Sequence, residues 1–146
     1  MSTETATSTE AASFVERFAA AWADPSPEAL SVLLHPEGRL IQPLEPEIRG
    51  RAAVEASWRR NFALIPDLRG EVLRWAASDD LLVIEVQLSG TIGGRRVVWI
   101  SSDHIRLEDG LVKERVAHFD PTPLVGALLR SPPTLLRFAR ARLARR

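Results

Sequence analysis

The spacing of apolar residues in the first half of the chain predicts three helices. Apolar side chains recur at the helical period after Ser13 and Glu16, a pair that matches the capping box of a helix start. A second, shorter helix is indicated by Ser26 as N-cap, with Pro27 in the first helical position. A third apolar stripe follows Gly50. The predicted helices span residues 13–24, 27–34 and 51–62.

The second half of the chain alternates apolar and polar residues with the period of two that strands require. In the segment IEVQLS, residues 84–89, every second side chain is apolar, so one face of the sheet is covered and the other meets solvent. Gly and Asp residues between the segments are typical of antiparallel hairpin turns. The predicted strands span residues 39–43, 68–77, 81–91, 95–107 and 111–120. Helices followed by a strand meander predict an α+β domain with its helices on one face of the sheet.

Both ends of the chain differ in composition from its middle. Residues 1–12 are Ser, Thr, Glu and Ala after the initial Met, a composition that predicts a disordered tail. From Pro121 onward there is no acidic residue, and arginines and leucines form a basic amphipathic helix. Such a helix can contact anionic membrane lipid or an acidic partner, although docking through its leucines is the favoured interpretation. The predicted organisation is a tail at 1–12, a domain at 13–124 and a basic helical extension at 125–146.

Composition narrows the classes of function. The 146 residues suit one domain, and 19 basic and 19 acidic residues cancel, so no net field favours nucleic acid. The absence of Cys excludes thiol chemistry and Cys-bound zinc. His35, His104 and His118 lack the spacing of a metal motif, so we expect neither a metal nor another cofactor. Because no signal-peptide pattern or membrane-spanning apolar run is present, we expect a cytoplasmic protein.

The segment VVWISSDHIRL, residues 97–107, places a carboxylate on the apolar face of a strand. Asp103 shares that face with Trp99, Ser101 and Ile105 because alternate side chains of a strand point to the same side. Either this acid serves a ligand or a reaction in an apolar pocket, or it has a structural partner. The residue types alone leave both possibilities open.

Five motifs between Ser13 and Leu124 add a second source of information. They are FVERFAAAWAD, LIQPLEP, IRGRAAVEASW, SSDHIRLEDGLV and HFDP, in that order. In order and spacing they resemble the nuclear transport factor 2-like superfamily, particularly its SnoaL-like polyketide cyclases and ketosteroid isomerases. The resemblance implies a cone in which a curved, mostly antiparallel sheet and the helices enclose an apolar cavity. It also implies a homodimer.

Only some of the catalytic residues of the isomerases have a matching residue in this chain. Asp103 matches the acid that donates a hydrogen bond to a developing enolate in those enzymes. The position of their base holds Gln42, and an amide cannot accept a proton at neutral pH. The position of their oxyanion-binding Tyr holds Phe18, and the acidic position of the cyclases and epoxide hydrolases on the last strand holds Ala117. The standard isomerase route is therefore not expected.

If the strand register of these relatives carries over, Arg115 faces the cavity across from Asp103. Without a cation nearby, apolar burial would keep Asp103 protonated and able to donate to a ligand oxygen. Paired with Arg115, the acid would instead be ionised and would hold two strands together. The residues expected to line the cavity are Phe18, Trp22, Gln42, Trp58, Val86, Leu88, Trp99, Ser101, Arg115, Ala117 and Phe119.

Two functions of different class follow from these residues. The first is a cofactor-free isomerase or cyclase-type enzyme for an apolar, polycyclic or polyketide-like molecule, with Asp103 as catalytic acid or oxyanion donor. The second is a non-catalytic ligand-binding or dimerisation module of the same fold. The expected partners are a small hydrophobic molecule and a second copy of the chain, without nucleic acid.

Overall fold

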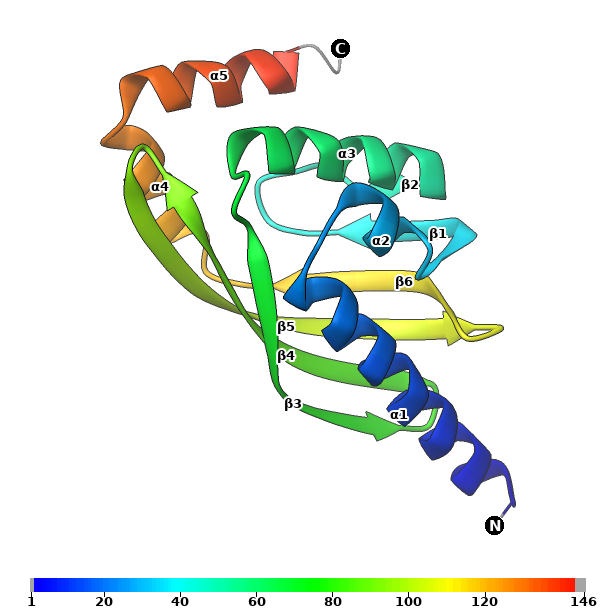
Figure 1. Ribbon diagram of the computed structural model, residues 1–146. Helices are drawn as coiled ribbons and strands as arrows, with labels where there is room; N and C mark the ends of the chain where they lie inside the picture. Colours follow the sequence, from blue (N-terminus) through cyan, green and yellow to red (C-terminus); the bar gives the residue numbers. More distant parts are fainter. Residues whose placement is uncertain (1, 144–146) are drawn as a thin grey trace.

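The computed structural model describes residues 2–143 and shows a strongly curved sheet with helices packed against it (Figure 1). The helices are α1 (Ser2–Ala23), α2 (Pro27–Ser31), α3 (Arg51–Leu64), α4 (Thr122–Leu129) and α5 (Pro132–Leu143). The strands are β1 (Leu34–Ile41), β2 (Ile48–Arg49), β3 (Arg69–Ser78), β4 (Leu81–Ile92), β5 (Arg95–Glu108) and β6 (Leu111–His118). The predicted α+β class is confirmed.

The sheet is mixed, with strand order β2-β1-β6-β5-β4-β3. Strands β1 and β6 run parallel, whereas the other neighbouring pairs are antiparallel. The hairpin between β4 and β5 turns at Gly93 and Gly94, with φ of 59° and 79°, which glycine adopts without strain. The long β3–β6 meander therefore follows the predicted turns, and the parallel β1–β6 pair brings the first strand beside the last.

Alternate residues of β5 point to opposite faces of the sheet, as the sequence predicts. The buried face carries Val97, Trp99, Ser101, Asp103 and Ile105. Between them, Val98 and Ile100 are 43% and 50% exposed. A carboxylate therefore lies among apolar side chains on the covered side of the sheet.

Helix α1 begins earlier than the sequence predicts. The pattern predicts a disordered tail up to residue 12 and a helix from Ser13, but the helix runs from Ser2 to Ala23. Ala11 is buried with Phe14 in the core, so the apolar stripe of the helix extends beyond the capping-box pattern. Ser13 itself is exposed within the helix and does not cap it.

The boundary between the second helix and the first strand also differs from the prediction. Helix α2 ends at Ser31, and β1 already begins at Leu34, where a helix end was expected. The pairing of β1 with β6 shifts register between Leu34 and Arg39. Gly38 lies within this irregular stretch, and a Cβ there would approach the Val112 carbonyl oxygen to 2.5 Å. Close contact with a strand distant in sequence thus extends β1.

The C-terminal helices pack against the rest of the fold. Helix α4 contacts β5, and α5 contacts α3 and α4. In α5, Leu135 and Phe138 pack against the core, whereas Leu136 and Leu143 are 51% and 66% exposed. The boundary predicted at residue 125 falls inside α4. Docking through apolar residues therefore describes this segment well.

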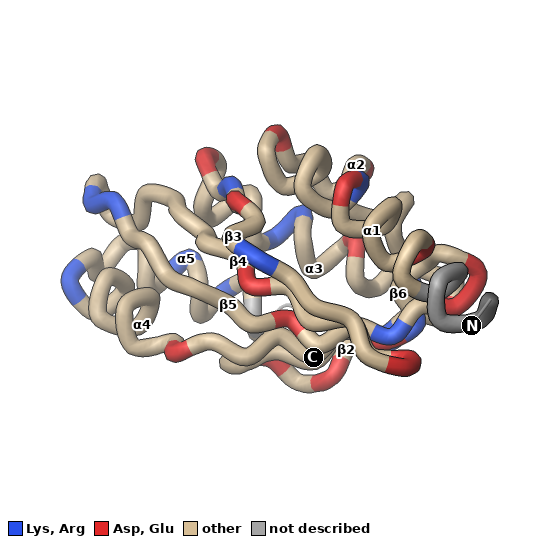
Figure 2. Tube along the Cα trace, turned by 90° about the horizontal axis from the view of Figure 1, so that it is seen from below, with Lys and Arg blue, Asp and Glu red and all other residues tan. Residues whose placement is uncertain are grey.

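Charged positions of both signs are spread along the chain trace (Figure 2). The exception is the C-terminal part, because α4 and α5 contain no acidic residue. None of the helices within residues 2–143 combines the length and the apolar character needed to cross a bilayer.

Candidate functional site

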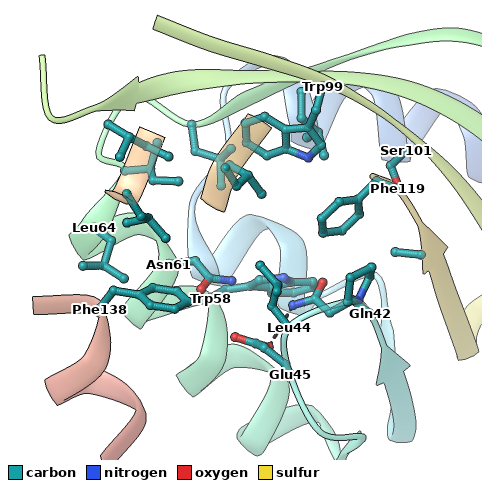
Figure 3. Close-up of a pocket in the computed structure, with 18 of the residues that line it drawn as sticks. Gln42, Leu44, Glu45, Trp58, Asn61, Leu64, Trp99, Ser101, Phe119 and Phe138 are labelled. Carbon is teal, nitrogen blue, oxygen red and sulfur yellow. Dashed lines mark hydrogen bonds between the residues drawn. The ribbon is translucent and has the colours of Figure 1, made fainter. Parts of the chain in front are cut away.

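A mainly apolar cavity of about 120 Å³ lies between the sheet and helix α3 (Figure 3). Helices α4 and α5 also contribute side chains to its wall. An apolar protein cavity of about 150 Å³ can hold a single aromatic ring, so this volume suits a small molecule. Its lining comprises Trp22, Gln42, Pro43, Leu44, Glu45, Trp58, Asn61, Leu64, Ile65, Leu68, Leu88, Ile92, Trp99, Ser101, Arg115, Ala117, Phe119, Leu124, Leu128, Thr134 and Phe138. Segments from both ends of the chain meet there.

Most residues predicted to line the cavity do so. They are Trp22, Gln42, Trp58, Leu88, Trp99, Ser101, Arg115, Ala117 and Phe119. Phe18, Val86 and Asp103 do not line it and are buried in the interior. The sequence assigned all of these residues to the covered face but could not separate cavity wall from deeper core.

Asp103 forms a buried ion pair with Arg115. Its Oδ2 accepts a hydrogen bond from Arg115 Nε at 2.9 Å and lies 2.7 Å from Nη2 in an ion pair. Its Oδ1 accepts from Ser101 Oγ at 2.6 Å. Asp103 is 0% exposed and Arg115 is 6% exposed. The direct cross-strand neighbour of Asp103 is Ala117, so the ion pair is diagonal rather than directly opposite.

The surroundings of Arg115 hold its guanidinium at the cavity wall. Its Cζ lies 5.7 Å from the ring centroid of Phe18 and 5.6 Å from that of Trp22. These distances permit cation–π contacts, which are stronger away from water. Asp103 lies behind the guanidinium and both of its oxygens already accept hydrogen bonds. The geometry therefore corresponds to the paired arrangement, in which Asp103 supports Arg115 and does not face a ligand.

The carboxylate of Glu45 does line the cavity, although the sequence analysis missed this residue. Its Oε2 accepts a hydrogen bond from Gln42 Nε2 at 2.8 Å (Figure 3). It also accepts one from Ser57 Oγ at 3.2 Å. Leu44, just before it, has φ of 70°, an uncommon conformation for a side chain of this size. The only sequence signal is an acidic residue between two prolines in LIQPLEP, a pattern shared by many exposed loops.

One group of side chains outside the cavity has metal-ligand spacing among the described residues. Ligand atoms of His35, Glu108 and Asp109 lie within 4.8 Å of one another. Lys113 Nζ contacts both Glu37 and Glu108 at 3.2 Å, and these contacts hold the pKa of Lys113 above its ordinary value. The positively charged ammonium of Lys113 beside Glu108 would repel a metal cation there. The cluster of His35, Glu108 and Asp109 therefore does not favour a metal site.

The curved mixed sheet, its helices and the apolar cavity define the class of protein. This architecture is that of the nuclear transport factor 2-like superfamily. The chain belongs to the SnoaL-like domain family, whose family model matches residues 15–115.

Solved structures of several proteins are similar to this chain. A protein named as a SnoaL-like polyketide cyclase from Jannaschia sp. CCS1 has a TM-score of 0.71 and 20% identity, covering 82% of this chain and 91% of its own. TerC, co-crystallised with polyporic acid, has a TM-score of 0.72 and 14% identity, covering 81% and 97%. A protein with a ketosteroid isomerase-like fold from Catenulispora acidiphila DSM 44928, in complex with trimethylamine, has a TM-score of 0.71 and 19% identity, covering 78% and 90%. At these identities the likeness shows the fold. No curated protein matches the sequence.

Replacing Asp103 by Asn should strongly destabilise the protein. The variant keeps the size of the side chain but leaves the buried Arg115 guanidinium without its counter-charge. We expect the free energy of unfolding to fall by about 3 to 5 kcal/mol, measured by urea denaturation followed by circular dichroism.

The matched control for this variant is Glu47→Gln. Glu47 pairs with Arg39 and Arg49 at the surface, where loss of an ion pair costs at most about 1 kcal/mol. If the Asp103 variant were no less stable than the control, the ion pair would not be a major support of this fold.

Proposed function

We propose that this protein binds a small, mainly apolar molecule of polycyclic or polyketide-like type, with one ring inside the cavity and the remainder at the open side of the cavity, and that Arg115 orients it. The observation that carries this proposal is a nearly fully buried guanidinium on the wall of an otherwise apolar cavity. Apolar walls favour a ring system by the hydrophobic effect, and a few placed polar groups fix its orientation. A ligand oxygen facing Arg115 would meet both requirements.

The hydrogen bonds of Arg115 support this role. A guanidinium has five N–H groups; Nε donates a hydrogen bond to Asp103, and Nη2 forms the ion pair with the same carboxylate. The two N–H groups of Nη1 are outside that interaction and are suited to a carbonyl or other oxygen acceptor. Asp103 and Ser101 fix the direction of the guanidinium before a ligand arrives, which reduces the entropy lost on binding.

The similar structures agree with a small-molecule function at this fold. TerC was crystallised with polyporic acid, and the Catenulispora acidiphila protein with trimethylamine. For the present chain, the large aromatic side chains Trp22, Trp58 and Trp99 favour a flat apolar ligand over a small polar one.

A cofactor-free isomerase or cyclase-type activity is the second candidate, favoured by the position of Glu45. Figure 3 shows Gln42 and Glu45 on the opposite side of the cavity from Trp99. An ionised Glu45 would take a proton from a carbon next to a ligand carbonyl, and the C–H electron pair would move toward the carbonyl oxygen. Arg115 would stabilise the negative charge on that oxygen. Asp103, which the sequence analysis predicted to be the catalytic acid or oxyanion donor, would act only by positioning Arg115.

The outer face of the sheet is the surface we propose for a homodimer. Val98 and Ile100 of β5 and Leu81 of β4 are all more than a third exposed and lie on this face. Large apolar side chains on neighbouring strands form a surface whose burial against a second copy would be favourable.

Replacing Ala117 by Phe should block the cavity. Ala117 is 4% exposed and lines the cavity, so a benzyl group there would occupy the space of a ligand. With naphthalene or 1-tetralone at tenfold its Kd, the native protein should gain about 1.4 kcal/mol, a Tm rise of about 2 to 6 °C. The variant should show no ligand-induced rise over its own ligand-free Tm in thermal unfolding.

The control for the cavity variant is His118→Phe, which places the same phenyl ring, in exchange for an imidazole, at an exposed position of the same strand. It should keep the full ligand response. Ligand stabilisation that persisted in Ala117→Phe, or that never occurred in the native protein, would contradict the proposed site.

Replacing Glu45 by Gln separates binding from chemistry. If this candidate holds, the native protein should accelerate the exchange of the α-protons of 2-tetralone with deuterium in D₂O, followed by proton NMR. Because Gln cannot accept the proton, the variant should lose about 10²- to 10⁴-fold of that acceleration while still binding the ketone. Equal exchange rates with and without the native protein would contradict the isomerase or cyclase-type activity. They would not contradict the proposed binding of a small molecule.

Replacing Ile100 by Glu should disrupt a dimer formed through the outer sheet face. Light scattering after size exclusion should give twice the chain mass for the native protein and the single-chain mass for the variant. Leu143→Glu introduces the same charge at an exposed position of α5 and should leave the dimer intact. A native protein that runs as a monomer at micromolar concentration would contradict this interface.

A further inference from the structure

Helix α5 has two faces of different character. Figure 1 shows it at the outer edge of the fold, where it contacts α3 and α4. Its inner face carries Thr134 and Phe138, which line the cavity. Leu136 and Leu143 are 51% and 66% exposed, and positions seven residues apart share one side of a helix, here the side away from Phe138. Packing within the fold therefore does not account for these two leucines.

Arginines lie beside the two exposed leucines. Arg140 follows Leu136 by four residues and precedes Leu143 by three, so it lies on the same stripe. Arg137 of α5 and Arg130, at the end of α4, are exposed as well. None of the ion pairs among residues 2–143 involves these three arginines. Their charges are therefore available to an anionic group outside the described chain.

The charge of the chain is unevenly distributed. Over the whole sequence, 19 basic and 19 acidic residues cancel. From Pro121 to Arg146, however, the sequence has six arginines and no acidic residue, so acidic residues are in excess in the remainder. A negatively charged surface therefore attracts the C-terminal segment and repels the rest of the molecule, which selects one orientation.

The mixture of leucine and arginine on one stripe suits a lipid bilayer better than a folded acidic partner. Leucine side chains can enter the boundary between headgroups and acyl chains while guanidinium groups stay beside the phosphates. A guanidinium can also bind one phosphate through two N–H groups. A folded partner requires a complementary shape, whereas lipids rearrange around an amphipathic stripe.

We propose that the outer face of α5 docks on the surface of an anionic phospholipid bilayer. This face is formed by Leu136, Arg137, Arg140 and Leu143. The helix lies in the plane of the interface, with its other face still lining the cavity. Docking thus brings the cavity wall next to the lipid, where apolar molecules accumulate. The proposal goes beyond the proposed function, and its test requires no cavity ligand, so each can fail without the other.

Co-sedimentation of the full chain with lipid vesicles tests the docking. The anionic vesicles contain phosphatidylcholine with about 30% phosphatidylglycerol, and the neutral vesicles contain phosphatidylcholine alone. The anionic vesicles should bind at least about 30-fold more tightly than the neutral ones. This binding should fall more than about 10-fold between about 0.1 M and about 1 M salt, because the Debye length shortens from ~10 Å to ~3 Å.

No binding to the anionic vesicles, or equal affinity for both kinds of vesicle, would overturn the proposal. Retention of the protein by poly-glutamate without vesicle binding would also overturn it, in favour of an acidic polypeptide as partner.

Replacing both Arg137 and Arg140 by Gln should weaken binding to the anionic vesicles by about 20- to 30-fold, since each basic residue near the surface contributes about a factor of five. The matched control replaces Arg49 and Arg106 by Gln, which removes the same charge at exposed positions outside α5. The control should bind within about 2-fold of the native chain. Equal losses in the two double variants would show a general charge effect and overturn the assignment to α5.

Replacing Leu143 by Gln tests the apolar part of the surface and should weaken vesicle binding by about 10-fold, because less apolar area enters the interface. Val32→Gln is the matched control, since Val32 is 65% exposed on a different part of the fold. Native affinity in the Leu143 variant would contradict insertion of this stripe. Circular dichroism checks that each variant folds, and the lipid and salt dependence of the native chain tests the proposal without any variant.

Discussion

The buried ion pair between Asp103 and Arg115 is the interaction on which the cavity depends. Removing two charges from water is costly, and the attraction between them compensates only when the geometry is good and other bonds are satisfied. Here Ser101 satisfies the second carboxylate oxygen, and the rings of Phe18 and Trp22 flank the guanidinium. The ion pair thus joins β5 and β6 and sets their position relative to α1. It also puts a polar group at one defined point of an apolar wall.

The topology explains why that wall belongs to a cavity. The parallel pairing of β1 with β6 brings the loop with Gln42 and Glu45 toward the strand that carries Arg115. The curvature of the sheet separates its buried face from α3, and α4 and α5 supply Leu128 and Phe138 to the lining. Helices α4 and α5 are therefore part of the candidate site, although they lie outside the family match, which ends at residue 115.

The polar groups of the cavity suggest how one fold can change its chemistry. Gln42 stands where the resemblance places a base, and its amide now donates a hydrogen bond to Glu45. Asp103, at the position of an oxyanion acid in the isomerases, accepts hydrogen bonds from Arg115 and Ser101. In both cases the residue that the motif singles out orients a neighbour that lines the cavity. A ligand would meet Arg115 and Glu45, so the proposed function follows from these neighbours.

The sequence alone determined the helices and hairpins, the α+β class, and the alternation that buries Asp103 beside Trp99 and Ser101. Such features depend on spacing within one segment, so a single sequence can reveal them. Only the tertiary structure decided that Asp103 pairs diagonally with Arg115 behind the cavity wall, and that Glu45 reaches the cavity. These contacts depend on strand register and on the packing of segments far apart in the chain. A pattern within one strand shows which face a side chain takes, but not which residue of another segment covers it.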